Sequence, residues 1–407
     1  MINTINYKEY RKKNDIHGTV LYPAVMVAPI QKKILENIIR EEEIISVFDP
    51  FHGSGTALYE ALELDPNMHI VGCDINPLAN LITKVKLQGV TKNISKDIDA
   101  IEEYLIDHTE IFPYEFPNMK KWFREDIIDS IALLRTAIMK ISNTKNRLFF
   151  WYILINVLRY NSNTRSSTYK LHIKSEDSIK KMQNNVIKYF LFSVRTNYLK
   201  FVHKADNYIL YKKDVLNIIG SFDDDLYDVS ITSPPYGDNA TTVPYGQFSM
   251  LALYTIPTYD LELEGWELDN YSKIDSNSVG SKNKPVLFDD YEKSLLKNYL
   301  CHIALSKQKK VINYFNDYFY FLRELCRVTK KYIVLTLGNR TVDRININLV
   351  SITRKYLQKN NYEVINIVRR IIPRKRTPKI TSCVYQHPVK SMNYEYILVY
   401  KKTKFFD

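Results

Sequence analysis

The chain has 407 residues, of which 45% are hydrophobic, and a formal net charge of +12 at pH 7. This is enough apolar sequence for one large domain with insertions or for two ordinary domains. It contains no run of eighteen apolar residues, and the polar N-terminus MINTINYKEYRKKND lacks the apolar segment of a signal peptide. We therefore expect neither export nor membrane spanning. The positive charge fits a polyanionic partner and a solvated lysine-rich surface equally well.

The cysteines are four in number, at positions 73, 301, 326 and 383, and they form no CxxC pair. Neither a disulfide framework nor a zinc site is indicated, so we expect a reducing, cytoplasmic location and no metal.

Strands alternate with helices at both ends of the chain, which is typical of a parallel sheet covered on both faces. Near the N-terminus we predict strands at 43–49 and 69–74 and helices at 54–64 and 77–87. Further strands are predicted at 207–214, 226–231, 330–338, 362–372 and 393–402, with helices at about 305–328 and 346–359. Amphipathic helical sequence between them predicts a helical insertion. The polar segment 259–300 is too long for a simple connection and indicates a lid, a recognition loop or a disordered insert.

The first chemical motif is DPFHGSGT, residues 49–56, between a predicted strand and a predicted helix. Gly53 and Gly55 let the backbone approach a ligand, and amide groups at a helix start bind a carboxylate or a phosphate. Asp74 ends the next strand, 21 residues after Gly53, where an acidic side chain accepts hydrogen bonds from ribose hydroxyls. The motif and the acid together predict a nucleoside-containing cofactor.

The identity of that cofactor follows from what the motif lacks. A phosphate-binding P-loop needs GxxxxGK[ST], but HGSGTALY has no lysine, and a dinucleotide site would have a third glycine near position 58, which is Leu58. S-adenosylmethionine fits the same turn and the same acid. The structural alternatives are a tight turn for the glycines and a helix cap for Asp74.

The second motif is ITSPPYGDN, residues 231–239, directly after a predicted buried strand. An exocyclic amino group is a poor nucleophile because its lone pair is delocalised into the base, so acceptors must hold its two hydrogens. The Ser233 hydroxyl and the Pro234 carbonyl suit this role, and the two prolines stiffen the turn. Tyr236 offers a face on which a base extruded from the duplex can stack.

This second motif resembles the catalytic motif of the DNA amino-methyltransferases, in which serine, aspartate or asparagine precedes Pro-Pro-Tyr at the end of the fourth strand. The wider family pattern is similar to HGTVLYPAVMVAPI before the glycine turn, to GCDINPLA at the second strand, and to TLGNR and MNYEYILVYKK near the C-terminus. The resemblance covers most of the chain outside the helical insertion and the polar segment. It implies a Rossmann-like α/β class I methyltransferase fold with a mostly parallel seven-stranded sheet.

The resemblance also implies two sets of site residues. The candidate catalytic residues are Ser233, Pro234, Pro235 and Tyr236. The candidate cofactor-binding residues are Tyr22, Asp49, Pro50, Phe51, Gly53, Gly55, Thr56, Asp74, Asn76 and Asp214. Tyr22 is expected to close over the methionine end of the cofactor and Asp214 to lie near its adenine ring. The structural alternative for Tyr22 is a turn at the entry to a helix. For Asp214 it is an exposed helix cap.

Two basic segments are predicted to contact DNA. Residues 161–174, NSNTRSSTYKLHIK, interleave basic side chains with hydroxyls, although an ordinary polar turn would look similar. Residues 369–379, RRIIPRKRTPK, hold the densest positive charge and are expected to form a loop at the edge of the catalytic turn, with a solvated charge run as the alternative. The candidate DNA-binding residues are Arg165, Lys170, His172, Arg370, Arg374, Lys375 and Arg376.

The predicted organisation has three segments. Residues 1–89 form the first part of a methyltransferase domain, 90–206 a helical insertion that is a candidate target-recognition region, and 207–407 the second part of the domain.

The predicted activity is methyl transfer from S-adenosylmethionine to the exocyclic amino group of a flipped base in double-stranded DNA. Transfer to carbon 5 of cytosine is disfavoured because that reaction uses a cysteine after a proline, and none of the four cysteines follows one. Within the resembled family, serine at position 233 favours N4 of cytosine as the methyl acceptor. The resemblance also implies a companion restriction endonuclease in the same system. An N6-adenine DNA methyltransferase, an RNA base methyltransferase and a non-catalytic DNA-binding relative are the alternatives.

Overall fold

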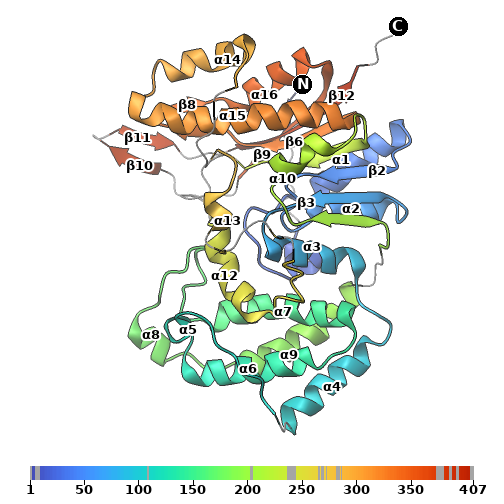
Figure 1. Ribbon diagram of the computed structural model, residues 1–407, viewed down its shortest axis with the longest axis vertical. Coiled ribbons are helices and arrows are strands. Elements are labelled where there is room, and N and C mark those ends of the chain that lie inside the picture. Colours follow the sequence, from blue (N-terminus) through green and yellow to red (C-terminus); the bar gives the residue numbers. More distant parts are fainter. Residues whose placement is uncertain are drawn as a thin grey trace.

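The computed structural model describes residues 2–4, 10–107, 110–201, 205–235, 244–264, 266, 270–271, 273–280, 285, 287–372, 380–384, 387–390 and 394–403. One end of the molecule holds a sheet with helices against it, and the other end is helical (Figure 1). Among the described residues, no helix combines the length and the apolar character that a membrane span requires.

The described strands include one sheet of eight, in the order β1-β9-β12-β6-β5-β2-β3-β4. Their bounds are β1 Ile2–Thr4, β2 Ser46–Asp49, β3 His69–Cys73, β4 Tyr208–Tyr211, β5 Tyr227–Thr232, β6 Thr329–Leu337, β9 Tyr362–Ile371 and β12 Tyr394–Lys402. Strands β4, β3, β2, β5 and β6 are parallel, whereas β12 is antiparallel to both β6 and β9. The predicted mostly parallel sheet of seven strands is therefore confirmed. The short β1 pairs with the edge of β9 and adds the eighth strand.

The central strands are buried because helices cover both faces of the sheet. Every residue of β2 and of β5 is buried, as expected for interior parallel strands. Alternate side chains point to opposite faces. Val47 and Val229 pack in the core beneath α1 (Ala28–Glu41) and α2 (Thr56–Leu64). Phe48 and Ile333 pack on the other side, in the core of α15 (Leu305–Val328) and α16 (Leu349–Lys359).

The helical end of the molecule lies in the chain between α3 (Pro77–Gln88) and β4. Its helices are α4 Ile94–Ile106, α5 Met119–Trp122, α6 Glu125–Met139, α7 Thr144–Asn161, α8 Glu176–Lys180 and α9 Val186–Asn197. Helix α7 is apolar around most of its circumference and is the centre of this part, with residues of α3, α4, α6, α9 and α12 (Tyr245–Thr255) in the same core. The helical layer is thereby joined to the sheet through α3 and to the segment after β5 through α12 (Figure 1).

Short elements complete the described chain. The hairpin β7 (Arg340–Val342) and β8 (Ile345–Ile347) follows β6, and β10 (Ile380–Val384) pairs with β11 (His387–Lys390). The described parts of the polar segment contain α13 (Lys273–Ser276) and α14 (Asp290–Leu300). Helix α10 is Val215–Ile218, and the 3₁₀ helices are Lys12–Asn14, Ile16–Gly18, Tyr198–Lys200 and Ile219–Ser221.

Candidate active site

The glycine turn connects the end of β2 to the start of α2. Gly53 and Gly55 have φ angles of 52° and 68°, in the left-handed region that favours glycine. A Cβ atom on Gly55 would lie 2.6 Å from Oγ1 and from Cγ2 of Thr83, which belongs to α3. The Thr83 hydroxyl also donates to the Gly53 carbonyl at 3.1 Å. Helix α3 thus fixes the shape of the turn.

Asp74, directly after β3, holds this turn through its carboxylate. Its Oδ2 accepts from the backbone N–H of Gly53 at 2.9 Å, and its Oδ1 accepts from that of Asn76 at 2.8 Å. Burial raises the pKa of Asp74, and the two backbone hydrogen bonds oppose that rise. The side chain is only half-buried, so its oxygens keep lone pairs that ligand hydroxyls can reach. The structure therefore brings the two predicted parts of the cofactor site into direct contact.

Asp49, the last residue of β2, is completely buried. Its Oδ1 accepts from the Phe51 backbone N–H at 3.1 Å, while its Oδ2 makes no hydrogen bond of ordinary geometry in the described part of the chain and interacts with the Thr232 hydroxyl more weakly. Burial raises the pKa of Asp49 to about 7. A buried carboxylate oxygen without a partner is unfavourable unless a ligand pairs with it. The turn therefore presents an acceptor suited to a cationic ligand group.

Two further predicted cofactor residues flank the turn. Pro50 lies directly after Asp49, and Thr56 is the first residue of α2.

Tyr22 lies against the glycine turn from the segment before α1. Its ring atom Cε1 is 3.5 Å from the position that a Cβ of Gly53 would occupy. Asn76 donates through Nδ2 to the Tyr22 hydroxyl at 3.4 Å and to the Ser249 hydroxyl at 2.8 Å. Ser249 belongs to α12, and the Tyr22 ring also contacts Tyr245 and Phe248 of that helix. The predicted cofactor residues Tyr22 and Asn76 are thus connected to the segment that follows the second motif.

The second motif begins where β5 ends. Strands β2 and β5 are parallel neighbours with Phe48 opposite Ser230, so Asp49 and Ser233 lie at the same carboxyl edge of the sheet. Ser233 is half-buried and Pro234 is buried. Tyr236 lies outside the described residues.

The Pro235 carbonyl accepts a hydrogen bond from the Tyr314 hydroxyl at 3.0 Å. Tyr314 is a buried residue of α15, and the guanidinium of Arg340 lies 4.4 Å from the centre of its ring. The turn is therefore supported from α15 and from β7, which follows β6. This arrangement places the glycine turn after β2 and the proline turn after β5 at the same edge of the sheet.

Comparison with known proteins finds similarity to methyltransferases. No family model matches the chain. It is 29% identical over 415 residues to the type II methyltransferase M.MvaI of Kocuria varians, a match that spans 95% of this chain and 90% of that protein. Along almost its whole length the chain is thus similar to a type II methyltransferase. The type II methyltransferase M.MjaII of Methanocaldococcus jannaschii is 31% identical over 99 residues, or 24% of this chain and 17% of that protein.

In this methyltransferase, Asp214 caps α10 by accepting from the Leu216 backbone N–H at 3.1 Å. It follows β4, which pairs with β3, and its side chain is half-buried. The helix cap is therefore observed, and a contact with the cofactor's adenine ring stays a prediction.

The first basic segment of the methyltransferase follows α7. Arg165 and His172 are exposed and Lys170 is half-buried. The Arg165 backbone N–H donates to the His172 carbonyl at 2.8 Å, and buried Arg159 donates to the Arg165 carbonyl at 3.1 Å. Tyr169 of this loop packs against Phe248 of α12. A structured loop thus carries exposed Arg165 and half-buried Lys170 close to the helix that follows the second motif.

The second basic segment is described only in part. Arg370 belongs to β9 and donates to the Glu395 carboxylate at 2.6 and 3.0 Å, so its charge is compensated by a neighbouring strand. Arg374, Lys375 and Arg376 lie outside the described residues, and their predicted role stays a prediction.

Several residues of the methyltransferase site were not identified from the sequence. Tyr314 lies in an aromatic helix with no local motif, and nothing near Ser249 indicates its contact with Asn76. Arg340 belongs to TLGNR, which the family resemblance includes, but its position beside Tyr314 has no local signal. Lys86 is buried and donates to the Ser54 carbonyl at 2.7 Å, and burial lowers its pKa to about 7.

Proposed function

We propose that this methyltransferase transfers the methyl group of S-adenosylmethionine to the exocyclic amino group of a base extruded from double-stranded DNA, with N4 of cytosine as the acceptor. The observation that carries the proposal is the meeting of two turns at one edge of the sheet. One turn follows β2 and contains Gly53 and Gly55, and the other follows β5 and begins at Ser233.

The residues of the first turn fit the charge pattern of S-adenosylmethionine. Its ammonium group matches Oδ2 of buried Asp49, which makes no hydrogen bond of ordinary geometry among the described residues, and its carboxylate matches the amide groups at the start of α2. Its ribose hydroxyls match Asp74, whose oxygens can accept further hydrogen bonds. Tyr22 closes the site from the segment before α1, and Asp214 belongs to the same edge of the sheet, after β4. The chain offers no lysine in the turn for a triphosphate.

The second turn would act on the target amino group. When bound, the cofactor supplies a methyl group activated by a sulfonium. The Ser233 hydroxyl and the Pro234 carbonyl accept the two hydrogens of the amino group, which leaves its lone pair directed at the methyl carbon. Because neither Pro234 nor Pro235 has an N–H, no backbone donor at these positions competes with the acceptors. The Tyr314 hydroxyl holds the Pro235 carbonyl, so the turn is preorganised. Tyr236 would stack on the extruded base.

The choice of N4 of cytosine rests on serine at position 233, since aspartate is commoner in this family for N6 of adenine. Double-stranded DNA as the partner is supported by the net charge of +12 and by the exposed cation Arg165. Residues 90–206 would be the target-recognition region between the two parts of the methyltransferase domain, 1–89 and 207–407. A restriction endonuclease of the same specificity would be the companion in a cytoplasmic restriction-modification system.

The proposal is tested by incubating the protein with S-adenosylmethionine carrying a labelled methyl group and with duplex DNA, RNA or no nucleic acid. The expected result is label in duplex DNA with wild-type protein and at least about 100-fold less with Ser233→Ala, since removal of one preorganised polar group costs that much in other enzymes. Label in RNA alone would favour an RNA base as substrate. Binding of DNA without label in any nucleic acid would favour the non-catalytic alternative.

A further inference from the structure

The backbone just before Tyr22 is held from the helical end of the molecule. Residues 19–22, the closing segment, lie outside every described helix and strand, so no paired strand sets their path. Asn156 of α7 bonds to this segment instead. Its Oδ1 accepts from the Leu21 backbone N–H at 2.9 Å, and its Nδ2 donates to the Thr19 carbonyl at 2.8 Å. One side-chain amide thus makes the two bonds that a neighbouring strand would make.

A second side chain of α7 strengthens this contact. Tyr152 precedes Asn156 by four residues, so the two side chains lie on one face of the helix. The Tyr152 hydroxyl shares a hydrogen bond of 2.5 Å with the hydroxyl of buried Thr19. Helix α7 (Figure 1) therefore binds the closing segment through the backbone and through a side chain.

The residues before the closing segment are bound to the other part of the molecule. His17 Nε2 and Glu60 Oε1 lie 2.7 Å apart, and both residues are buried. Glu60 belongs to α2, the helix that follows the glycine turn. Residues 17–22 are therefore held between α2, which covers the sheet, and α7 of the helical insertion.

The contacts of α7 bear on the position of Tyr22. This residue is buried, and its Cε1 lies 3.5 Å from the position that a Cβ of Gly53 would occupy. Two residues later, Ala24 has a φ of 49°, in the left-handed region that is unfavourable for a residue with a Cβ. Such a backbone conformation persists where surrounding contacts hold it. Asn156 supplies contacts of this kind directly before Tyr22.

We propose that Asn156 is a positioning residue for cofactor binding. It holds the closing segment so that Tyr22 covers the glycine turn, and the helical insertion thereby contributes to the S-adenosylmethionine site as well as to target recognition. The inference rests on the proposed function, in which Tyr22 closes that site. Asparagine suits the role because one amide accepts from an N–H and donates to a carbonyl, a combination that neither alanine nor an ionised aspartate offers.

The test measures the Kd for S-adenosylmethionine by titration calorimetry, without nucleic acid. Asn156→Ala removes both hydrogen bonds to the closing segment and is expected to raise the Kd about tenfold. Asn156→Asp keeps the size of the side chain and the acceptor for Leu21 but loses the donor to Thr19, so it should weaken binding as well. With saturating cofactor, kcat should stay close to that of the wild type, because Asn156 acts on the cofactor site through Tyr22.

Asn146→Ala is the matched control on the same helix. Buried Asn146 donates to the Thr91 hydroxyl at 2.7 Å and to the Asp97 carboxylate at 2.6 Å. It thus connects α7 to the start of α4 and has as many side-chain bonds to lose as Asn156. Its loss should lower the midpoint of urea unfolding but leave the Kd within about twofold of wild type.

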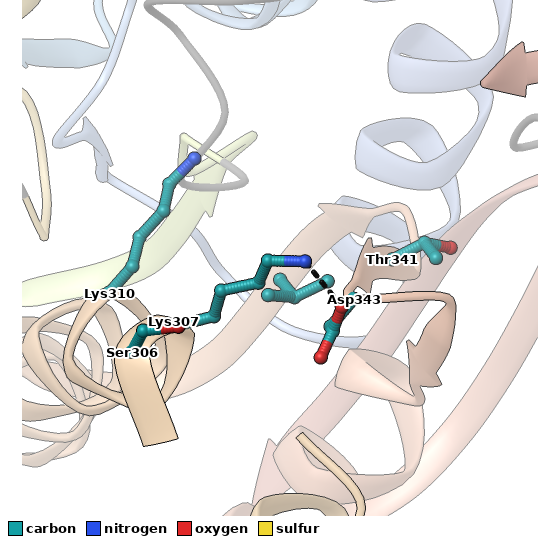
Figure 2. Close-up of a pocket in the computed structure, with 6 residues that line it drawn as sticks. Ser306, Lys307, Lys310, Thr341 and Asp343 are labelled. Carbon is teal, nitrogen blue, oxygen red and sulfur yellow. Dashed lines mark hydrogen bonds and ion pairs between the residues drawn. The ribbon is translucent and has the colours of Figure 1, made fainter. Parts of the chain in front are cut away.

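Ser306→Ala is a remote control at the surface. Ser306 is exposed and lines a pocket of about 330 Å³ between the first turns of α15 and the β7–β8 hairpin, where Lys307 extends toward Asp343 (Figure 2). The residues that line this pocket are Ser306, Lys307, Lys310, Thr341, Val342 and Asp343. None of them belongs to α7 or to the closing segment, so the Kd should again stay within about twofold of wild type.

The double variant Tyr22→Ala with Asn156→Ala shows whether Asn156 acts through Tyr22. Once the ring is gone, Asn156→Ala should change the Kd little, because the two residues serve one contact. The inference is overturned if Asn156→Ala binds as tightly as Asn146→Ala, or if its loss of affinity is undiminished in the Tyr22→Ala background. In both cases, cofactor binding by the wild type leaves the proposed function in place. A wild-type protein that binds no S-adenosylmethionine would overturn both.

Discussion

The hydroxyl of Tyr314 donates a hydrogen bond of 3.0 Å to the carbonyl of Pro235. This contact joins a helix that covers the sheet to the turn that begins at Ser233, and 79 residues separate the two partners in the chain. The guanidinium of Arg340 lies 4.4 Å from the centre of the Tyr314 ring. The candidate catalytic turn is therefore held by residues far from it in sequence.

Tyr314→Phe should lower kcat while cofactor binding stays unchanged. The lost hydrogen bond contributes about 1 kcal/mol to holding the turn, which corresponds to about a fivefold loss of rate. Tyr318→Phe is a matched control on the same helix, because the buried Tyr318 hydroxyl shares a hydrogen bond of 2.8 Å with Thr353 of α16. Steady-state kinetics with saturating cofactor make the comparison. Equal kcat values for the two variants would show that Tyr314 has no positioning role.

S-adenosylmethionine should bind more weakly as the pH falls below about 7. Burial raises the pKa of Asp49 to about 7, and a protonated Asp49 cannot pair with an ammonium group. Titration calorimetry from about pH 5.5 to about pH 8.5, on either side of that pKa, measures the trend. Asp49→Asn should bind weakly throughout and lose most of the pH dependence. An unchanged pH profile in that variant would assign the dependence to another group.

The same carboxyl group should affect the stability of the protein without cofactor. Its pKa in the folded state lies above the value of about 3.9 expected in an unfolded chain. The stabilising contribution of Asp49 is therefore present at low pH and is lost as the pH rises through about 7. At about pH 8, Asp49→Asn should raise Tm, by roughly 2–4 °C for each 1 kcal/mol of stability gained, as followed by calorimetry without cofactor. A lower Tm would mean that the carboxylate is satisfied in the free protein.

Gly55→Ala should abolish cofactor binding or weaken it strongly. The left-handed backbone costs about 1–2 kcal/mol for a residue with a Cβ, and that Cβ would lie 2.6 Å from two side-chain atoms of Thr83. Adding Thr83→Ala removes those two atoms and should restore part of the binding, so the two substitutions should couple. Binding losses that simply add would contradict the proposed steric cause.

Asp260→Ala should destabilise the protein strongly. Buried Asp260 accepts from Arg147 at 2.8 Å and from the indole N–H of Trp151 at 2.7 Å, and so connects α7 to the segment after α12. Removing one partner of a buried ion pair costs about 3–5 kcal/mol. Asp206→Ala is the control, since its ion pair with Lys145 is largely exposed and should change little. Urea unfolding of both variants provides the test, and similar midpoints would contradict it.

Much of the sheet could be predicted from local sequence pattern. The predicted helix 305–328 has the observed bounds of α15, and β9 and β12 begin or end within one residue of the predicted strands. Long amphipathic helices and buried apolar strands can be predicted locally, because the spacing of apolar residues in the sequence matches the spacing of buried positions in the element. That the residues after β2, β3 and β5 meet at one edge also follows from the parallel arrangement of these strands.

The supporting contacts of the site could not be predicted in this way. The bond of Tyr314 to Pro235, the bond of Asn76 to Ser249 and the packing of Thr83 on Gly55 all join distant segments. Their partners are chosen by the tertiary arrangement, which a local pattern does not encode. Arg370 shows the same effect, because its basic segment predicted an exposed loop whereas this residue pairs with Glu395 on the neighbouring strand.

The central claim is tested most directly by identifying the methylated nucleoside. Unmethylated genomic DNA is incubated with the protein and labelled S-adenosylmethionine, digested to nucleosides and analysed by mass spectrometry, with Ser233→Ala in parallel. The account predicts N4-methylcytosine with the wild type and almost none with the variant. N6-methyladenine would keep the mechanism and contradict the assigned base, and the absence of any methylated nucleoside would contradict the account as a whole.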